Sequence, residues 1–309
     1  MIRMFNEIHF EIENRCLLDC KHCSSRDMRI NEKCRCGYGL EDIKKMISIL
    51  KDPIHIYFTG GEPLINHNIT KYIKELKEFR EGLDIGVFTC GIVNSFGKLR
   101  SISSQEARYY KLIGLSNCYI SIYDLDSKVH SEITNMNESL KYTLQTIENF
   151  KNEGINVKIH LVLNRYNIDK IDEIIQKLAV LGVTEVRILR LVKSGSAIDN
   201  WDSIGVSYEY QNKVINNIIK NKDRYNINIT ISGFPKEVPC RPFSEAYMCQ
   251  GGTNVLYVEL NGDVYPCACT KSNEQFKIAH ISEIDLINRY RINCSDYNND
   301  CLNPLKVLK

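Results

Sequence analysis

The sequence predicts an α/β fold: a partial (β/α)6, TIM-like barrel followed by a small α+β region that contains a β-hairpin. Three observations support this fold class: six short runs rich in Ile, Val, Tyr and Phe, a helical spacing of apolar residues between those runs, and a change of pattern after about residue 191. Alternation of strands with helices is typical of a parallel sheet whose crossovers are helices. A doubly wound open sheet is the structural alternative.

Six strands are expected in the first two thirds of the chain. They are the runs Ile8–Ile12, Ile54–Thr59, Ile85–Thr89, Tyr119–Tyr123, Val157–Leu163 and Val186–Leu191. Helices are expected between them, for example where Ile43, Met46, Ile47 and Leu50 fall on one helical face. Because no reversal of strand order is evident, the units favour a curved sheet with functional groups on the loops that follow the strands.

The pattern changes in the last third of the chain. A break at Lys193–Ser196 precedes a helix expected at Tyr208–Lys220 and a strand expected at Ile227–Ile231. Asn261-Gly262 lies between two β-rich runs and is the strongest short signal for a hairpin. We therefore expect a barrel domain over residues 1–200, and a linker with a smaller domain over residues 201–309.

Composition indicates a globular protein. Of 309 residues, 43% are hydrophobic and 25% are charged, and 40 basic residues nearly balance 38 acidic ones for a net charge of +2. No basic block predicts contact with nucleic acid or with a membrane surface. No run approaches the roughly 20 apolar residues of a membrane-spanning helix, and the first residues lack the apolar core of a signal peptide. These features predict a cytoplasmic protein.

The cysteine content points to metal binding. Thirteen cysteines are too many for ordinary packing, and in a reducing compartment they favour metal or redox use over disulfides. Cys16, Cys20 and Cys23 form a C-x3-C-x2-C run directly after the first expected strand. Three thiolates without a fourth suit a four-iron cluster in which one iron keeps an open position. A structural zinc site is the simpler alternative, but zinc normally takes four ligands.

This cysteine spacing, and its place after the first strand, resemble the cluster loop of the radical SAM enzymes. Gly60, Gly61, Glu62 and Pro63 follow the second strand and are similar to the family's glycine-rich segment for the amino group of S-adenosylmethionine. The resemblance implies a [4Fe-4S] cluster whose open iron binds S-adenosylmethionine, and a 5′-deoxyadenosyl radical that abstracts hydrogen. The glycines would allow close backbone approach to the ligand, and Glu62 is better suited to support the loop than to acid–base work.

Residues at the ends of later strands complete the cofactor site that the resemblance implies. They are Ser121 and Tyr123 on the fourth strand, Asn164 after the fifth, and Leu189 with the residues up to Val192 after the sixth. These residues would lie near the ribose, carboxylate and adenine, although each could instead be a packing residue of the barrel. The family also implies an electron donor of the flavodoxin or ferredoxin type.

Cysteines near the end of the chain resemble the auxiliary-cluster domains of many radical SAM enzymes, the SPASM type and the shorter twitch type. Cys249 and Cys267 flank the hairpin, and Cys294 and Cys301 follow a helix-like segment at Ile281–Arg291. The resemblance implies that these four cysteines hold one auxiliary [4Fe-4S] cluster. A two-cluster domain would bring a denser run of cysteines at this end, so one auxiliary cluster is favoured over two.

Two further cysteines of this region have open roles. Cys269 stands two positions after Cys267 and could replace one of the auxiliary ligands. Cys240 precedes the auxiliary ligands and could be a ligand, a buried thiol or a hydrogen-atom donor. The donor role is implied by resemblance to radical SAM peptide epimerases, which use such a cysteine to quench the substrate radical.

The segments before and after the predicted barrel bear on the reaction class. The cluster loop begins at residue 16, which leaves no room for a leader-peptide recognition domain before it, and the chain ends without the Gly-Gly tail of molybdopterin-precursor synthases. We expect modification of a ribosomally made peptide, most specifically epimerisation at an α-carbon. The alternatives are thioether or carbon–carbon crosslinking in a peptide, dehydrogenation of a small molecule by a twitch-type enzyme, and a non-enzymatic iron–sulfur electron carrier.

Overall fold

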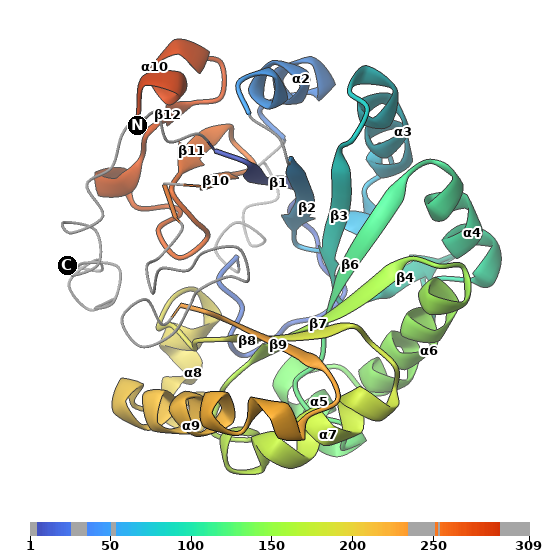
Figure 1. Ribbon diagram of the computed structural model, residues 1–309, viewed down its shortest axis with the longest axis vertical. Helices are drawn as coiled ribbons and strands as arrows, with labels where there is room; N and C mark the ends of the chain where they lie inside the picture. The colour runs from blue at the N-terminus through green and yellow to red at the C-terminus, as the bar shows by residue number, and fades with distance from the viewer. Residues whose placement is uncertain (1–4, 26–35, 51–53, 234–250, 253, 291–309) are drawn as a thin grey trace.

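The computed structural model describes residues 5–25, 36–50, 54–233, 251–252 and 254–290 (Figure 1). Within these residues the main sheet has ten strands in the order β12-β11-β10-β1-β2-β3-β6-β7-β8-β9. The sheet is curved and mostly parallel, and helices cover its convex face (Figure 1). The predicted α/β fold with a partial barrel is confirmed.

The six predicted barrel strands are present within a few residues of their expected ends. They are β1 (Glu7–Glu13), β2 (His55–Gly60), β3 (Asp84–Thr89), β6 (Leu115–Ser121), β7 (Asn156–Val162) and β8 (Glu185–Leu189). Each strand pairs in parallel with the next along this series. Most residues of β1 and β6 are buried, as expected for parallel strands that are covered on both faces.

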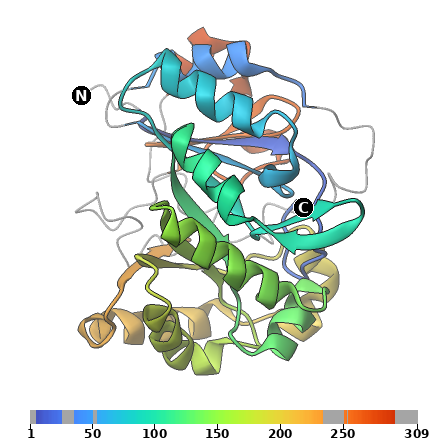
Figure 2. The ribbon, with the colours of Figure 1, turned by 90° about the vertical axis from the view of Figure 1, so that its right-hand side faces the viewer.

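Amphipathic helices connect the strands and follow them. They are α2 (Leu40–Ser48), α3 (Ile69–Phe79), α4 (Ser104–Leu112), α5 (Ser127–Thr134), α6 (Ser139–Asn152), α7 (Ile171–Val180), α8 (Ser196–Ile204), α9 (Tyr208–Lys220) and α10 (Ile284–Arg289). In α2, for example, Leu40, Ile43, Met46 and Ile47 are buried while charged residues occupy the other face. Figure 2 shows these helices beside the sheet. The first helices along the chain are blue and cyan, and the following ones are green to orange.

The sheet continues past residue 200 at both of its edges. β9 (Asn228–Ser232) pairs in parallel with β8, and β10 (Val255–Val258) pairs in parallel with β1. β11 (Asp263–Tyr265) and β12 (Ala279–His280) then add antiparallel strands beside β10. The predicted hairpin is therefore present, but it extends the barrel sheet because the open edge of β1 is available for pairing. The division of the chain at residue 200 stays a prediction.

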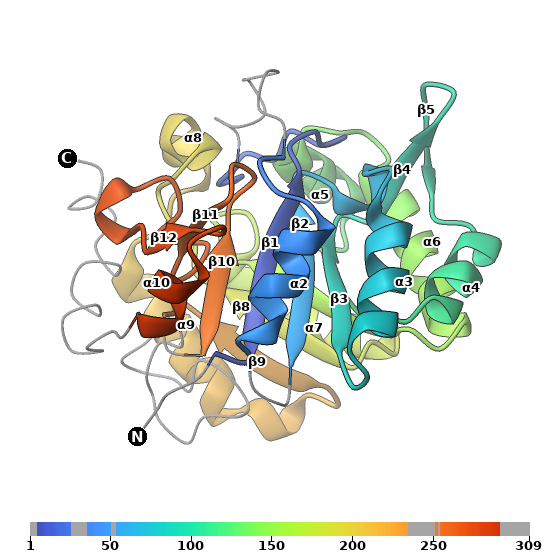
Figure 3. The same cartoon turned by 90° about the horizontal axis from the view of Figure 1, so that it is seen from above.

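The structure contains three features that the sequence does not predict. A hairpin of β4 (Ile92–Ser95) and β5 (Lys98–Ser101) projects from the end of the sheet after β3, and α8 lies at the same end (Figure 3). At the hairpin tip Phe96 and Gly97 both have positive φ, 49° and 75°. The turn lacks the Asn-Gly or Asp-Gly pair that usually marks such hairpins, which explains why it was not expected. The third element is the short strand β12.

No helix in the described part of the chain is long and apolar enough to cross a membrane.

Candidate active site

The three cysteines of the cluster loop line one cavity at the carboxyl ends of the barrel strands. The cavity has a volume of about 340 Å³, and Cys16, Cys20 and Cys23 all contribute to its wall. The end of the loop is held by the start of α8, where Ser196 N donates a hydrogen bond to Cys23 O (2.8 Å). Gly195, at a φ of 53°, permits this contact, because a Cβ there would lie 2.3 Å from Cys23 O.

Backbone hydrogen bonds also fix the middle of the cysteine loop to the end of α5. Asp19 N donates to Thr134 O (3.1 Å), and Lys21 N donates to Ile133 O (2.9 Å). Neither bond depends on a side chain. The loop is therefore anchored on both sides while its cysteines face the cavity.

The glycine-rich loop packs directly against the cysteine loop. Gly61 N donates to Glu13 O (2.6 Å), and Glu62 N donates to Arg15 O (2.8 Å). A Cβ on Gly60 would lie 2.2 Å from Glu13 O, and a Cβ on Gly61 would lie 2.0 Å from Arg15 O. Both glycines line the cavity, and the atoms that would exclude a side chain belong to Glu13, at the end of β1, and to Arg15, which directly precedes Cys16. This tight packing is a second reason for glycine at both positions, and the role of the glycines in close approach to a ligand stays a prediction.

Glu62 is fully buried and braces the glycine-rich loop against β3. Its carboxylate accepts hydrogen bonds from Leu64 N (3.0 Å), Thr89 Oγ1 (2.6 Å) and Cys90 N (2.8 Å). Burial raises the pKa of Glu62, and the hydrogen bonds from Cys90 and Thr89 oppose that rise. Pro63 starts the short 3-10 helix Pro63–Ile65 and is buried, and neither Glu62 nor Pro63 lies in the cavity wall.

The remaining predicted cofactor residues divide into two groups. Ser121, Tyr123 and Leu189 line the cavity. Asn164 is buried outside the cavity wall, and its Oδ1 accepts a hydrogen bond from Tyr166 N (2.9 Å) within the loop after β7. Their individual roles stay predictions.

Two further side chains line the cavity beside the three cysteines, His22 from the cluster loop itself and Cys90 from the loop after β3. The ring of His22 lies edge-on to Tyr123, with centroids 4.4 Å apart, and burial together with nearby His130 lowers the pKa of His22 to about 4. Cys90 also lines the cavity. Hydrogen bonding to Cys16, burial and the charge of Glu62 raise the pKa of the Cys90 thiol, so Cys90 stays protonated at neutral pH.

The cysteines near the end of the chain are only partly described. Cys269 lines the same cavity as the cluster loop, and a Cβ on Gly251 would lie 3.4 Å from Cys267 Sγ. Gly251 stands two positions after Cys249 in the chain. Cys240, Cys249, Cys294 and Cys301 lie outside the described residues, so the predicted auxiliary ligand set and the predicted hydrogen-atom donor stay predictions.

A buried ion pair joins the start of the chain to the segment that follows the hairpin. Lys271 Nζ lies 2.7 Å from Glu11 Oε1, and the two side chains are 6% and 2% exposed. Lys271 also donates to Ser25 Oγ (2.5 Å), just after the cysteine loop, and Tyr257 donates to Glu11. These contacts fix the turn of Cys269 and Lys271 against β1.

Two buried arginines belong to the cavity wall: Arg190 lies within the run from Leu189 to Val192 that is predicted to complete the cofactor site, whereas Arg187 has no predicted role. Arg187 and Arg190 are both 8% exposed and belong to the run predicted as the sixth strand. Arg187 lies 3.3 Å from the carboxylate of Glu185, and its guanidinium lies over the ring of Tyr119 at 4.3 Å. Two arginines in a strand expected to be buried were the available signal, because buried charges are rare unless they are paired or functional.

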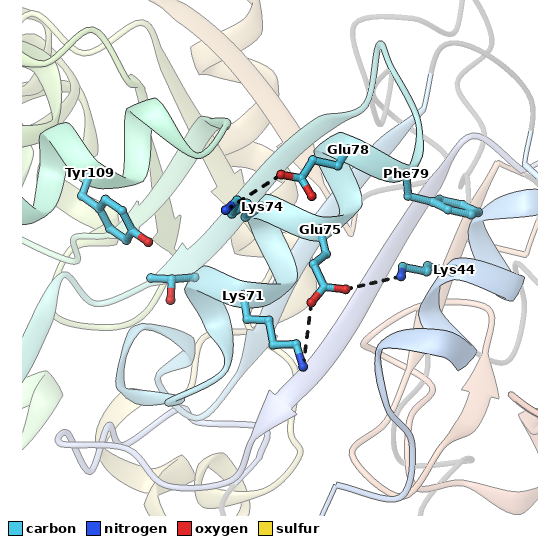
Figure 4. Close-up of a pocket in the computed structure, with 8 residues that line it drawn as sticks. Lys44, Lys71, Lys74, Glu75, Glu78, Phe79 and Tyr109 are labelled. Carbon is cyan, nitrogen blue, oxygen red and sulfur yellow. Dashed lines mark hydrogen bonds and ion pairs between the residues drawn. The ribbon is translucent and has the colours of Figure 1, made fainter.

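A second hollow on the outer surface carries no comparable chemistry. It lies between α2, α3 and α4, and its charged side chains pair with one another (Figure 4). Glu75 lies 3.4 Å from Lys44 and 3.8 Å from Lys71, and Lys74 lies 4.0 Å from Glu78. No cysteine or histidine is among its described lining residues. The chemistry of the chain is therefore expected in the cysteine-lined cavity.

The family model of the Radical SAM superfamily matches residues 10–178. The chain belongs to this superfamily. The matched span is more than half of the chain and runs from β1 to α7, so it includes the cysteine loop, the glycine-rich loop and their supporting strands.

Curated relatives include other radical SAM proteins at low sequence identity. The mycofactocin maturase MftC of Mycolicibacterium smegmatis is 24% identical over 264 residues, which cover 84% of this chain and 63% of MftC. The AdoMet-dependent heme synthase of Oleidesulfovibrio alaskensis is 25% identical over 280 residues, which cover 84% of this chain and 69% of the synthase. The match thus spans less than two thirds of the length of MftC.

Among solved structures, this radical SAM chain is similar to SuiB of Streptococcus suis. The crystal structure of SuiB bound to S-adenosylmethionine has a TM-score of 0.69 and 16% identity, and the match covers 98% of this chain and 68% of SuiB. SuiB bound to precursor peptide SuiA has a TM-score of 0.66. At this identity the likeness establishes a shared fold.

The residues of the cavity fit the cofactor pair that membership in the superfamily implies, a four-iron cluster with S-adenosylmethionine. Three soft thiol ligands come from one anchored loop, and the cavity beside them is large enough for a small ligand. No group of three or more His, Cys, Asp or Glu side chains among the described residues is arranged to hold a single metal ion. Three thiols on one anchored loop suit a four-iron cluster, in which each cysteine binds a different iron.

Proposed function

We propose that this protein is a radical SAM enzyme that modifies a ribosomally made peptide, most specifically by epimerisation at an α-carbon. The observation that carries the proposal is the convergence of Cys16, Cys20, Cys23, Gly60 and Gly61 on one cavity. Similarity to MftC, a maturase, and to SuiB, which was crystallised with a precursor peptide, supports a peptide as the substrate class.

Within this proposal the chain's own residues bind, orient and exclude water. The three cysteines hold the cluster, and Ser121, Leu189 and the glycine-rich backbone line the space for S-adenosylmethionine. When bound, this cofactor pair supplies the reductive cleavage that is the source of the hydrogen-abstracting radical. Phe88 and Tyr257 add aromatic surface to the same cavity, which limits access of water to the reacting atoms.

The proposal includes an electron donor and a second cluster. A flavodoxin- or ferredoxin-type protein would supply the electrons. Cys249, Cys267, Cys294 and Cys301 would hold an auxiliary [4Fe-4S] cluster, with Cys269 as a substitute ligand and Cys240 as the hydrogen-atom donor. The segment before β10 lies beside Cys267, since a Cβ on Gly251 would lie 3.4 Å from Cys267 Sγ. Iron analysis of the reconstituted protein tests this: about eight irons per chain are expected, falling to about four in Cys267→Ala if the auxiliary cluster is lost.

Isotope incorporation tests the reaction itself. The anaerobically reconstituted protein is incubated with S-adenosylmethionine, a reductant and a short peptide encoded beside its gene, in ordinary and in heavy water. Epimerisation predicts an unchanged peptide mass in ordinary water and a gain of one deuterium in heavy water. A loss of two hydrogens would contradict epimerisation and favour crosslinking or dehydrogenation. Cys23→Ala is the control that removes a cluster ligand.

A small molecule is the second candidate substrate. The heme synthase and probable GTP 3′,8-cyclases among the relatives are named for reactions on other substrate classes. Formation of 5′-deoxyadenosine without modification of any tested peptide would favour that alternative over the peptide proposal.

A further inference from the structure

Some barrel strands expose the side chains that face the inside of the barrel. In β7 every second residue from Asn156 to Val162 is partly exposed, and the residues between them are buried. In β3, Phe88 is partly exposed although both of its chain neighbours are buried. His160, Val162 and Phe88 all line the cysteine-lined cavity. The interior of a closed barrel is filled by its own side chains, so these exposed positions mark a surface that can bind a ligand.

The apolar centre of this surface is the ring of Phe88. Its centroid lies 4.8 Å from the ring of His9 on β1 and 4.8 Å from the ring of His160 on β7. All three side chains line the cavity, and we call them the aromatic floor. Because rings from strands on either side contact Phe88, the exposed part of Phe88 faces the cavity.

A second layer of rings supports the aromatic floor. Tyr57 stacks on Phe88, with centroids 4.8 Å apart and planes 14° apart, and Tyr119 stacks on His160 at 4.4 Å. Neither tyrosine is part of the cavity wall. Gly86 leaves room for Tyr57, because a Cβ there would lie 2.6 Å from Tyr57 Cε1. The floor is therefore held in place before any ligand binds, which lowers the entropic cost of binding.

The aromatic floor lies deeper in the barrel than the cysteines and glycines. Phe88 stands two positions before Cys90, and His9 stands four positions before Glu13, the last residue of β1. At about 3.3 Å per residue, these positions are roughly 7 Å and 13 Å further along their strands. A substrate group must therefore extend into the barrel to contact the floor.

We propose that the aromatic floor binds an aromatic side chain of the peptide substrate. Contact with Phe88 removes apolar surface from water on both partners, and a ring gains a further favourable contact with the rings of the floor. An aliphatic side chain gains only the burial, and alanine gains little of either. This inference rests on the proposed function and adds to it a selection for peptides with an aromatic residue.

Peptide binding without turnover tests the aromatic floor. Three pentapeptides, Ala-Ala-Phe-Ala-Ala, Ala-Ala-Leu-Ala-Ala and penta-alanine, are radiolabelled by acetylation, which adds no ring. They are equilibrated by dialysis with the reconstituted protein and S-adenosylmethionine. The wild type is expected to bind the phenylalanine peptide at least about tenfold more tightly than penta-alanine, and more tightly than the leucine peptide. Equal binding of the three peptides, binding of none, or tightest binding of the leucine peptide would overturn the inference.

Variants of Phe88 assign the selection to the floor. Phe88→Leu keeps an apolar side chain but removes the ring, and is expected to lower the ratio of the phenylalanine to the penta-alanine affinity about threefold or more. Phe88→Tyr keeps the ring and is expected to retain most of the ratio. Phe79→Leu is the control, since Phe79 lies on α3, is 47% exposed and lines a different hollow. A ratio of two affinities does not depend on the fraction of folded protein, so a purely structural role of Phe88 would leave it unchanged.

The adenine of S-adenosylmethionine is the competing ring for the floor. Weaker binding of S-adenosylmethionine to Phe88→Leu, with the ratio of peptide affinities intact, would overturn the inference. If Phe88→Leu does not fold, the comparison of the three peptides on the wild type still decides.

The inference and the proposed function fail in different ways. A protein that prefers the phenylalanine peptide but incorporates no deuterium refutes epimerisation and leaves the aromatic floor standing. A protein that epimerises peptides with and without an aromatic residue equally well refutes the aromatic floor alone.

Discussion

Two walls of the same cavity are held together by different physical means. The cysteine wall, made of Cys16, Cys20, Cys23, Gly60 and Gly61, is fixed by backbone hydrogen bonds and by close contact of two loops. The cationic wall, made of Arg187, Arg190 and Lys271, is fixed by side-chain ion pairs and ring contacts. Backbone contacts tolerate little variation, whereas side chains can be exchanged one at a time. The first wall is therefore sensitive to small changes of the backbone, and the second can be altered by single substitutions.

The largest expected effect comes from breaking the ion pair behind the cationic wall. Lys271→Met leaves the carboxylate of Glu11 buried without its cation, so the free energy of unfolding should fall by about 3–5 kcal/mol. Urea unfolding of the protein, followed by circular dichroism, measures this loss. Because Glu11 is on β1 and Lys271 follows β11, the effect also tests whether the end of the chain stabilises its start.

An exposed ion pair is the matched control for Lys271→Met. Lys177 lies 2.5 Å from Glu173 on α7, but these side chains are 57% and 61% exposed. Lys177→Met is expected to leave the free energy of unfolding almost unchanged. Equal losses in the two variants would contradict the view that burial makes the Lys271 pair important.

Adding one methyl group at Gly61 is the most direct way to disturb the cysteine wall. Gly61→Ala places a Cβ 2.0 Å from Arg15 O, so the glycine-rich loop must separate from the cysteine loop. The expected loss is about 1–3 kcal/mol of stability, and the reconstituted protein should hold less iron. Gly39→Ala is the control, since a Cβ there meets nothing within 4 Å. Full iron content in Gly61→Ala would show that contact between the loops is not required.

The smallest effect concerns pH and the carboxylate of Glu259 near the cationic wall. Burial raises the pKa of Glu259, opposed by the hydrogen bond from Ser272, and nearby Glu11 adds to the rise. Because the pKa of Glu259 is higher in the folded protein than in the unfolded one, protonation of Glu259 favours folding. This contribution to stability is complete below the unfolded-state pKa and is lost as the pH rises through the folded-state pKa. The stability of the wild type relative to Glu259→Gln should therefore fall as the pH rises above the ordinary glutamate pKa of about 4. A constant difference, measured by urea unfolding below and above that value, would contradict this assignment.

The sequence and the structure agree where the signal is local. The cysteine loop and the glycine-rich loop are each contained in a few residues after one strand, so their spacing alone identifies them. The reason for the glycines was not local, because the atoms that exclude a Cβ belong to Glu13 and Arg15. The pair of Glu11 and Lys271 could not be predicted, since only the pairing of β10 with β1 brings residues 260 positions apart together.

The pattern of apolar residues likewise predicts that a segment forms a strand, but it does not predict which strand that segment pairs with. The run predicted at residues 227–231 is a strand, but its pairing with β8 depends on the open edge of the barrel. Arg187 and Arg190 were visible in the sequence as charges in a buried strand. Their convergence with Lys271 required the curvature of the sheet.

Release of 5′-deoxyadenosine is the most direct test of the account. The anaerobically reconstituted and reduced protein is incubated with S-adenosylmethionine, and the nucleoside is quantified by chromatography. The wild type is predicted to release 5′-deoxyadenosine, and Cys23→Ala, which lacks one ligand of the cysteine wall, is predicted to release none. Absence of the product from a wild-type protein that holds its full iron content would contradict the central claim and favour a non-enzymatic iron–sulfur protein.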